Sequence, residues 1–97
     1  MIYRNNKLTI YNFDISKIIK KYKTPIYCYS LKGIKENIKI LKNSFKKINP
    51  LICYAVKANS NLGILKEIKK RNLGADVVSG GELMKALKAG IKPKKIV

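Results

Sequence analysis

The sequence contains no histidine and no tryptophan, and only five of its 97 residues are acidic. Without histidine, the chain lacks the commonest metal ligand and the commonest general base. Its two cysteines, Cys28 and Cys53, each lie within an apolar run, which is typical of small buried side chains. We therefore expect no metal centre and no disulfide framework.

Long hydrophobic runs are also missing. No stretch approaches the length that spans a bilayer, and the first residues, 1–7, contain no apolar segment of signal-peptide length. We therefore expect a cytoplasmic protein with no membrane partner. A chain of 97 residues suffices for one small domain, and such a domain buries only a modest share of its surface.

Positive charge, by contrast, is abundant. The formal net charge is +17, from 22 lysines and arginines, of which only Arg4 and Arg71 are arginine. Base-edge and bidentate phosphate contacts favour arginine, and the lysines recur between apolar positions as they do on any solvated helix face. A basic nucleic-acid-binding module remains an alternative, but we expect no specific nucleic-acid partner.

The first part of the chain predicts a strand followed by a short helix. Residues 7–12 have strand composition, and Asp14 or Ser16 can cap a helix that ends before Pro25. Three apolar residues lie on this helix, namely Ile15, Ile18 and Ile19. We assign residues 1–24 to an N-terminal extension.

From residue 25 onward, strands and helices alternate. The predicted strands are 26–29, 51–56, 75–78 and the beginning of one at 95–97; the helices between them are 31–48, 62–71 and 79–90. Strict alternation with short connections predicts an α/β fold with parallel strands. One βα unit about every twenty residues is typical of a (β/α)8 TIM barrel, and no glycine-rich dinucleotide motif follows any strand.

We therefore predict a partial (β/α)8 barrel, of which residues 25–97 form the first βα units. A closed barrel needs around 250 residues, so we expect this chain to be a fragment of one.

Lys57 differs from the other lysines because it directly follows the apolar run 51–56. Strand alternation would place it on one face with Cys53 and Ala55. In a barrel, such a lysine reaches the C-terminal mouth, where a partly desolvated amine can attack an aldehyde. The alternative is a strand-end lysine that extends into solvent, and position alone favours this alternative.

The stretch Tyr-Ala-Val-Lys-Ala-Asn-Ser-Asn at 54–61 resembles the cofactor-lysine motif of the fold-type III pyridoxal-phosphate enzymes, which include ornithine, arginine and diaminopimelate decarboxylases. Three further segments, 24–29, 76–83 and 90–97, resemble segments of this family in the same order. The sequence of residues 76–83, Asp-Val-Val-Ser-Gly-Gly-Glu-Leu, is most similar to the corresponding segment of diaminopimelate decarboxylases. The resemblance extends over about residues 22–97.

The resemblance implies that Lys57 holds pyridoxal 5'-phosphate. It implies an amino-acid decarboxylase, with meso-diaminopimelate converted to L-lysine and carbon dioxide, and a homodimer as the working state. In this family, the phosphate-binding residues, the carboxylate at the ring nitrogen and the C-terminal β-domain follow later in the chain. An inactive truncated remnant of such an enzyme is therefore the second hypothesis, and we expect these 97 residues alone to be inactive.

Two acidic residues match family positions near the cofactor lysine. Asp76 falls within an apolar strand, where a carboxylate needs a partner, and Lys57 is a candidate for it. We predict that Asp76 contributes to the cofactor site, with a purely structural role as the alternative. Glu82 is three residues after Ser79, which favours a capping box over a site role. Asn59–Asn61 are expected to cap the next helix, and Asn72 stands where relatives often have glycine.

Overall fold

The computed structural model describes residues 1–97, and the chain divides into two units within helix α2 (Leu31–Ser44). The first unit is Met1–Asn37 and the second is Ile38–Val97. The predicted boundary after residue 24 stays a prediction. None of the helices is both long and apolar enough to cross a lipid bilayer.

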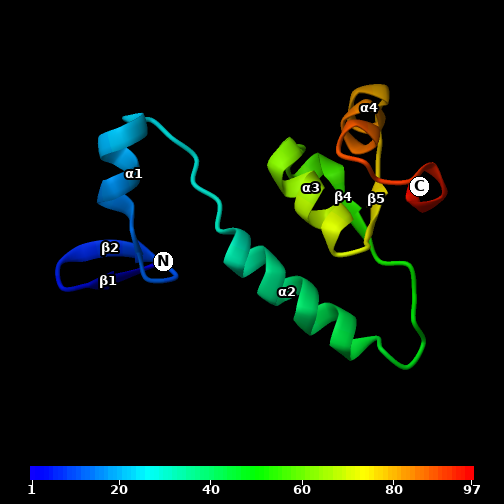
Figure 1. Ribbon diagram of the computed structural model, residues 1–97, viewed down its shortest axis with the longest axis horizontal. Coiled ribbons are helices and arrows are strands. Elements are labelled where there is room, and N and C mark those ends of the chain that lie inside the picture. Colours follow the sequence, from blue (N-terminus) through cyan, green and yellow to red (C-terminus); the bar gives the residue numbers. More distant parts are fainter. The chain divides into compact units, whose positions relative to one another are not determined.

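The first unit begins with three antiparallel strands, β1 (Ile2–Arg4), β2 (Lys7–Ile10) and β3 (Phe13–Asp14) (Figure 1). The sequence analysis predicted only the middle strand. Each connection is a two-residue turn in which both residues have positive φ: Asn5 and Asn6 in the first, Tyr11 and Asn12 in the second. Such turns match the twist of paired strands, and asparagine tolerates them, so Asn5-Asn6 was the signal for the missed hairpin.

Helix α1 (Ile15–Tyr22) forms as predicted, and it follows β3 directly. Asp14 caps it, since its carboxylate accepts a hydrogen bond of 2.9 Å from the Ser16 amide. The predicted strand at 26–29 is wrong. Its residues form no strand and pair with no neighbour, and the Tyr27 side chain is 89% exposed. A β-branched and aromatic run becomes a strand only where another strand pairs with it.

Helix α2 begins as predicted, because Ser30 accepts a hydrogen bond from the Gly33 amide at 3.3 Å. It ends at Ser44 instead of at residue 48, and turns occupy 45–48. Most of its apolar stripe stays exposed; Ile38 is its buried residue.

The second unit contains the parallel strands β4 (Cys53–Ala55) and β5 (Gly74–Asp76), connected through helix α3 (Leu62–Lys70). Helix α4 (Gly80–Lys88) and the 3-10 turn η2 (Pro93–Lys95) follow β5. Ile96 then pairs in parallel with Ala75 as an isolated bridge. The parallel pairing of β4 with β5 and the order β4, α3, β5, α4 confirm the predicted βα pattern from β4 onward (Figure 1).

The core of the second unit lies between the strands and the helices α3 and α4, which contact each other. Its most deeply buried side chains are Val56, Leu65, Ile68, Ala75 and Ala86. The strand β4 is shorter than the predicted run 51–56, and its residues are half-buried, not buried on both faces. β4 is half-buried because only one strand, β5, pairs with it, and its other edge has no neighbouring strand.

The turn after α3 explains the departure noted at position 72. Asn72 has φ +62°, and the Leu73 amide donates to the Ile68 carbonyl, as in a Schellman C-cap. Glycine is the usual residue at such a position, and asparagine is the next most tolerant. The Asn72 side chain and carbonyl also accept hydrogen bonds from Lys95 Nζ, at 2.6 and 3.1 Å.

Candidate functional site

Lys57 lies just past the end of β4, at the carboxyl end of a parallel strand pair. The strand stops at Ala55, and the 3-10 turn η1 (Val56–Ala58) carries Lys57. The predicted alternation of faces therefore does not reach Lys57, because a 3-10 turn rotates each side chain by about 120° instead of reversing it. Val56 is fully buried beside it and anchors the turn in the core.

The Lys57 side chain is exposed, and it forms no hydrogen bond or ion pair with residues 1–97. The partial desolvation that we expected is not provided by these residues. The amine is therefore not engaged by another side chain of these residues.

Asp76 is the last residue of β5, and its Cα is paired with that of Ala55 in the strand register. Asp76 and Lys57 therefore both lie at the carboxyl ends of the two parallel strands. The carboxylate of Asp76 is half-buried and forms no hydrogen bond or ion pair within the chain. The proposed pairing between Asp76 and Lys57 is therefore not formed in this structure.

The residues after Lys57 form a hydrogen-bonded turn that leads into α3. The Asn61 carboxamide caps the helix by accepting from the Gly63 amide at 2.8 Å, as predicted. Asn59 instead accepts from the Asn61 amide at 3.0 Å, and its carbonyl accepts from the Tyr54 hydroxyl at 3.1 Å. Ser60 does not cap α3; its hydroxyl accepts from Lys85 of α4 at 2.8 Å.

Glu82 takes part in the cap of α4, in the way that the sequence favoured. The Ser79 hydroxyl accepts from the Glu82 amide at 3.2 Å. The Glu82 carboxylate reaches back to the amide of Val78 at 2.9 Å, one residue before the predicted Ser79. The reciprocal bonds stabilise the first turn of α4 and hold the segment that follows Asp76.

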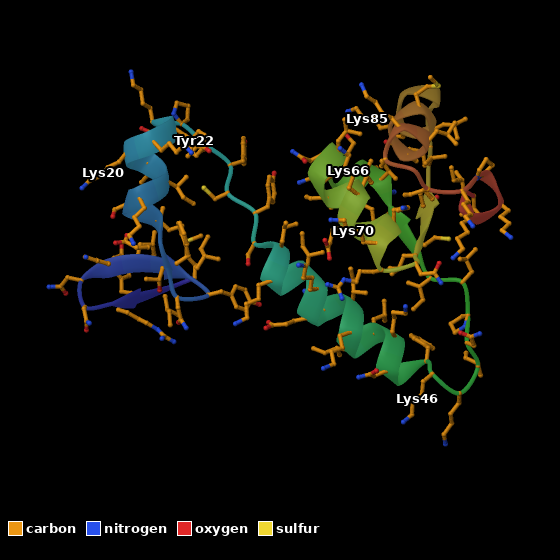
Figure 2. All side chains as sticks on the ribbon, viewed as in Figure 1. Lys20, Tyr22, Lys46, Lys66, Lys70 and Lys85 are labelled. Carbon is orange, nitrogen blue, oxygen red and sulfur yellow. The ribbon has the colours of Figure 1, made fainter.

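Other chemistry is sparse in the described residues 1–97. No group of three histidine, cysteine, aspartate or glutamate side chains is arranged to hold a metal ion. Both cysteines are free thiols. Lys85 lies next to the candidate site and was not predicted, because it belongs to no motif and is one of many exposed lysines (Figure 2).

Comparison with known proteins places this geometry in a family. Residues 31–97 match the family described as pyridoxal-dependent decarboxylase, pyridoxal binding domain. A diaminopimelate decarboxylase of Helicobacter pylori is 51% identical over 85 residues, which cover 88% of this chain and 21% of that protein. The chain spans about a fifth of the length of the curated relatives that it matches.

Solved structures agree with the sequence relatives. A crystal structure of an Aquifex aeolicus protein matches 98% of this chain and 23% of its own, with a TM-score of 0.90 and 42% identity. The structure of diaminopimelate decarboxylase from Helicobacter pylori complexed with L-lysine matches 86% of this chain and 21% of its own, with a TM-score of 0.80 and 47% identity.

The predicted fold, the first βα units of an alanine-racemase-like (β/α)8 barrel, is thereby confirmed. The chain belongs to the pyridoxal-dependent decarboxylases, and within that family it is most like the diaminopimelate decarboxylases.

Proposed function

We propose that this chain is the lysine-bearing segment of a pyridoxal-phosphate-dependent carboxy-lyase, and that Lys57 binds the cofactor. The observation that carries the proposal is the position of Lys57. It is an exposed, unbonded amine at the carboxyl end of a parallel strand, within the matched pyridoxal-binding domain. Active sites of (β/α)8 barrels lie at that end of the strands.

The residues present fit the cofactor. A primary amine without a hydrogen-bond partner is the group that an aldehyde requires, and Lys57 supplies it. Asp76 supplies a half-buried carboxylate without a partner from the adjacent strand end, and such a group calls for a positively charged or hydrogen-bonding ligand. We propose that both residues contact the cofactor, Lys57 covalently and Asp76 as an acceptor.

The chemistry of the reaction divides between cofactor and protein. When bound, the pyridinium ring of pyridoxal phosphate takes up the electron pair that remains after carbon dioxide leaves. The contribution of this chain is orientation, since β4, η1 and the turn 59–61 fix the backbone on both sides of Lys57. Lys57 would hold the cofactor through its amine, which would give up its protons as the aldehyde oxygen leaves as water and take protons back when it is released.

We further propose an amino-acid substrate, meso-diaminopimelate, with L-lysine as the product. Support comes from the curated relatives named diaminopimelate decarboxylase and from the related structure complexed with L-lysine. A homodimer remains a prediction from the family resemblance, and a cytoplasmic location remains a prediction from the hydrophobic pattern of the sequence.

Reduction with borohydride after addition of pyridoxal phosphate tests the role of Lys57. We expect one labelled peptide, the one that contains Lys57, and loss of that label in Lys57→Ala. Lys66→Ala is the matched control, because Lys66 is an exposed lysine of α3 without a hydrogen-bond partner, and it should leave the label unchanged (Figure 2). Label spread over many lysines, or kept in Lys57→Ala, would contradict the proposal.

The substrate is tested in the complete enzyme chain that contains this segment. We expect carbon dioxide release from meso-diaminopimelate and none in Lys57→Ala. Release of carbon dioxide from ornithine or arginine instead would support the carboxy-lyase activity and contradict the proposed substrate.

A further inference from the structure

The backbone on the two sides of Lys57 is held in different ways. On one side, the fully buried Val56 and the pairing of Ala55 with Asp76 fix the start of the turn. On the other side, the hydrogen bonds of Asn59 and Asn61 connect residues no more than five positions apart. Such bonds set the shape of the turn and join it to the start of α3, but they do not connect it to α4.

One hydrogen bond joins this turn to an element that is distant in sequence. Lys85 Nζ, on α4, donates to the Ser60 hydroxyl at 2.8 Å, across 25 positions of sequence. α4 also contacts η1, which carries Lys57. Because the donor is a cation, the bond is stronger than one between neutral groups, and its exposure to solvent reduces this advantage.

We infer that Lys85 is a positioning residue for Lys57, acting through Ser60. The inference rests on the proposed function, since it concerns the lysine that is to bind the cofactor. Lys85 ties the turn 59–61 to α4, and α4 is itself fixed to the end of β5 by the bonds of Ser79 and Glu82. α4 thereby connects the turn next to Lys57 with the segment that follows Asp76. This connection matters because a displacement of a reacting group by about 1 Å is enough to slow a reaction strongly.

A set of single substitutions separates the effect of losing this hydrogen bond from the effects of losing a positive charge or of lowering the stability of the protein. Lys85→Met removes the ammonium and keeps an apolar stem, Lys85→Arg keeps a cationic donor, and Ser60→Ala removes the acceptor. Lys88→Met is the matched control, because Lys88 is an exposed lysine of the same helix without a hydrogen-bond partner, and the change in net charge is the same.

The first measurement is hydrogen–deuterium exchange of residues 56–61 in the complete chain without cofactor. We expect these amides to exchange roughly three- to tenfold faster in Lys85→Met and in Ser60→Ala, which is the effect of losing one exposed hydrogen bond to a charged donor. Lys85→Arg should restore slow exchange, and Lys88→Met should match the unsubstituted protein.

The second measurement is the affinity for pyridoxal phosphate, followed by the absorbance of the cofactor bound at Lys57. We expect a loss of about three- to tenfold in Lys85→Met and in Ser60→Ala, no further loss in the double variant, and recovery in Lys85→Arg. Additive losses in the double variant would show that the two side chains act separately, and would overturn the inference.

The outcomes distinguish the inference from the proposed function. If Lys85→Met and Lys88→Met show the same exchange and the same cofactor affinity while the cofactor still binds at Lys57, the inference is wrong and the proposed function stands. If the unsubstituted complete chain takes up no cofactor at Lys57, the proposed function is wrong, and the inference fails with it.

Discussion

Gly74 begins β5 opposite Cys53, and the space next to its Cα is filled by neighbouring strands. A Cβ added at this position would lie 2.7 Å from the Cys53 sulfur and would overlap the backbone carbonyl oxygen of Lys95. The cysteine side chain can rotate, but the carbonyl belongs to the segment that pairs with β5. Only glycine therefore allows the three chain segments to approach this closely.

Gly74→Ala should lower the free energy of unfolding by about 1–3 kcal/mol, because the added methyl group forces the strands apart. Gly80→Ala is the control, since nothing lies within 4 Å of its added Cβ and alanine favours helix. Urea denaturation followed by circular dichroism measures both. Equal stability of the two variants would mean that the segment 95–97 moves freely and that the packing around Gly74 is not required.

At the scale of residues, the sequence predicted helix caps correctly, because a cap needs only one side chain and the backbone close to it in sequence. Asn61 caps α3 and Ser79 caps α4, as their types and positions indicated. It failed where the partner comes from elsewhere: Ser60 accepts from Lys85, and Asp76 forms no ion pair with Lys57. A sequence states which groups can bond, but the distance between two strand ends or two helices is a property of the fold.

At the scale of elements, α1 depends on a single charged cap. The hydrogen bonds that Asp14 accepts from Ser16 hold the pKa of its carboxyl below the ordinary 3.8, and the charges of Lys7 and Lys17 lower it further. Lys7 Nζ lies 3.7 Å from the carboxylate.

The stability of α1 should therefore depend on pH in the acid range. A carboxyl with a lowered pKa in the folded state contributes stability above 3.8, and loses it as the pH falls through the folded pKa. We expect the Ser16 amide resonance to shift, and helical signal to fall, as the pH drops below 3.8. Asp14→Asn keeps an acceptor without the charge and should abolish this step; a step unchanged in Asp14→Asn would assign it to another carboxyl.

The elements also show why pattern alone misplaced one strand. The run 26–29 has strand composition, as 51–56 does, yet only the latter forms part of a strand, because β5 pairs with it. The hairpin β1–β2 was missed for the opposite reason. Its strands are short and exposed, and their pairing is set by the turn residues Asn5 and Asn6 more than by apolar periodicity.

At the scale of the whole molecule, the net charge of +17 opposes folding. Lysines project from helices of both units, among them Lys20 on α1 and Lys66 and Lys70 on α3 (Figure 2). Against this excess stand five acidic residues, which form ion pairs such as Lys7 with Asp14 and Arg71 with Glu67. Unscreened repulsion between the remaining charges destabilises the folded chain.

Stability should therefore rise with ionic strength. Between about 10 and 150 mM sodium chloride the screening length shortens from roughly 30 to 8 Å, and we expect the unfolding midpoint to increase. Thermal denaturation at a series of salt concentrations measures it, and sucrose, which adds no charge, is the control for general solvent effects. A midpoint that falls with salt would show that attractive charge pairs outweigh the repulsion.

The family, the order of the βα units and the position of Lys57 after a strand followed from the sequence, because motif residues, hydrophobic spacing and caps are local properties. The tertiary structure decided which runs became strands and that β4 ends at Ala55. It also brought Lys85 to Ser60 and left Asp76 without a partner in this chain. These outcomes depend on distances between segments far apart in the sequence, and such distances exist only once the strands and helices have packed.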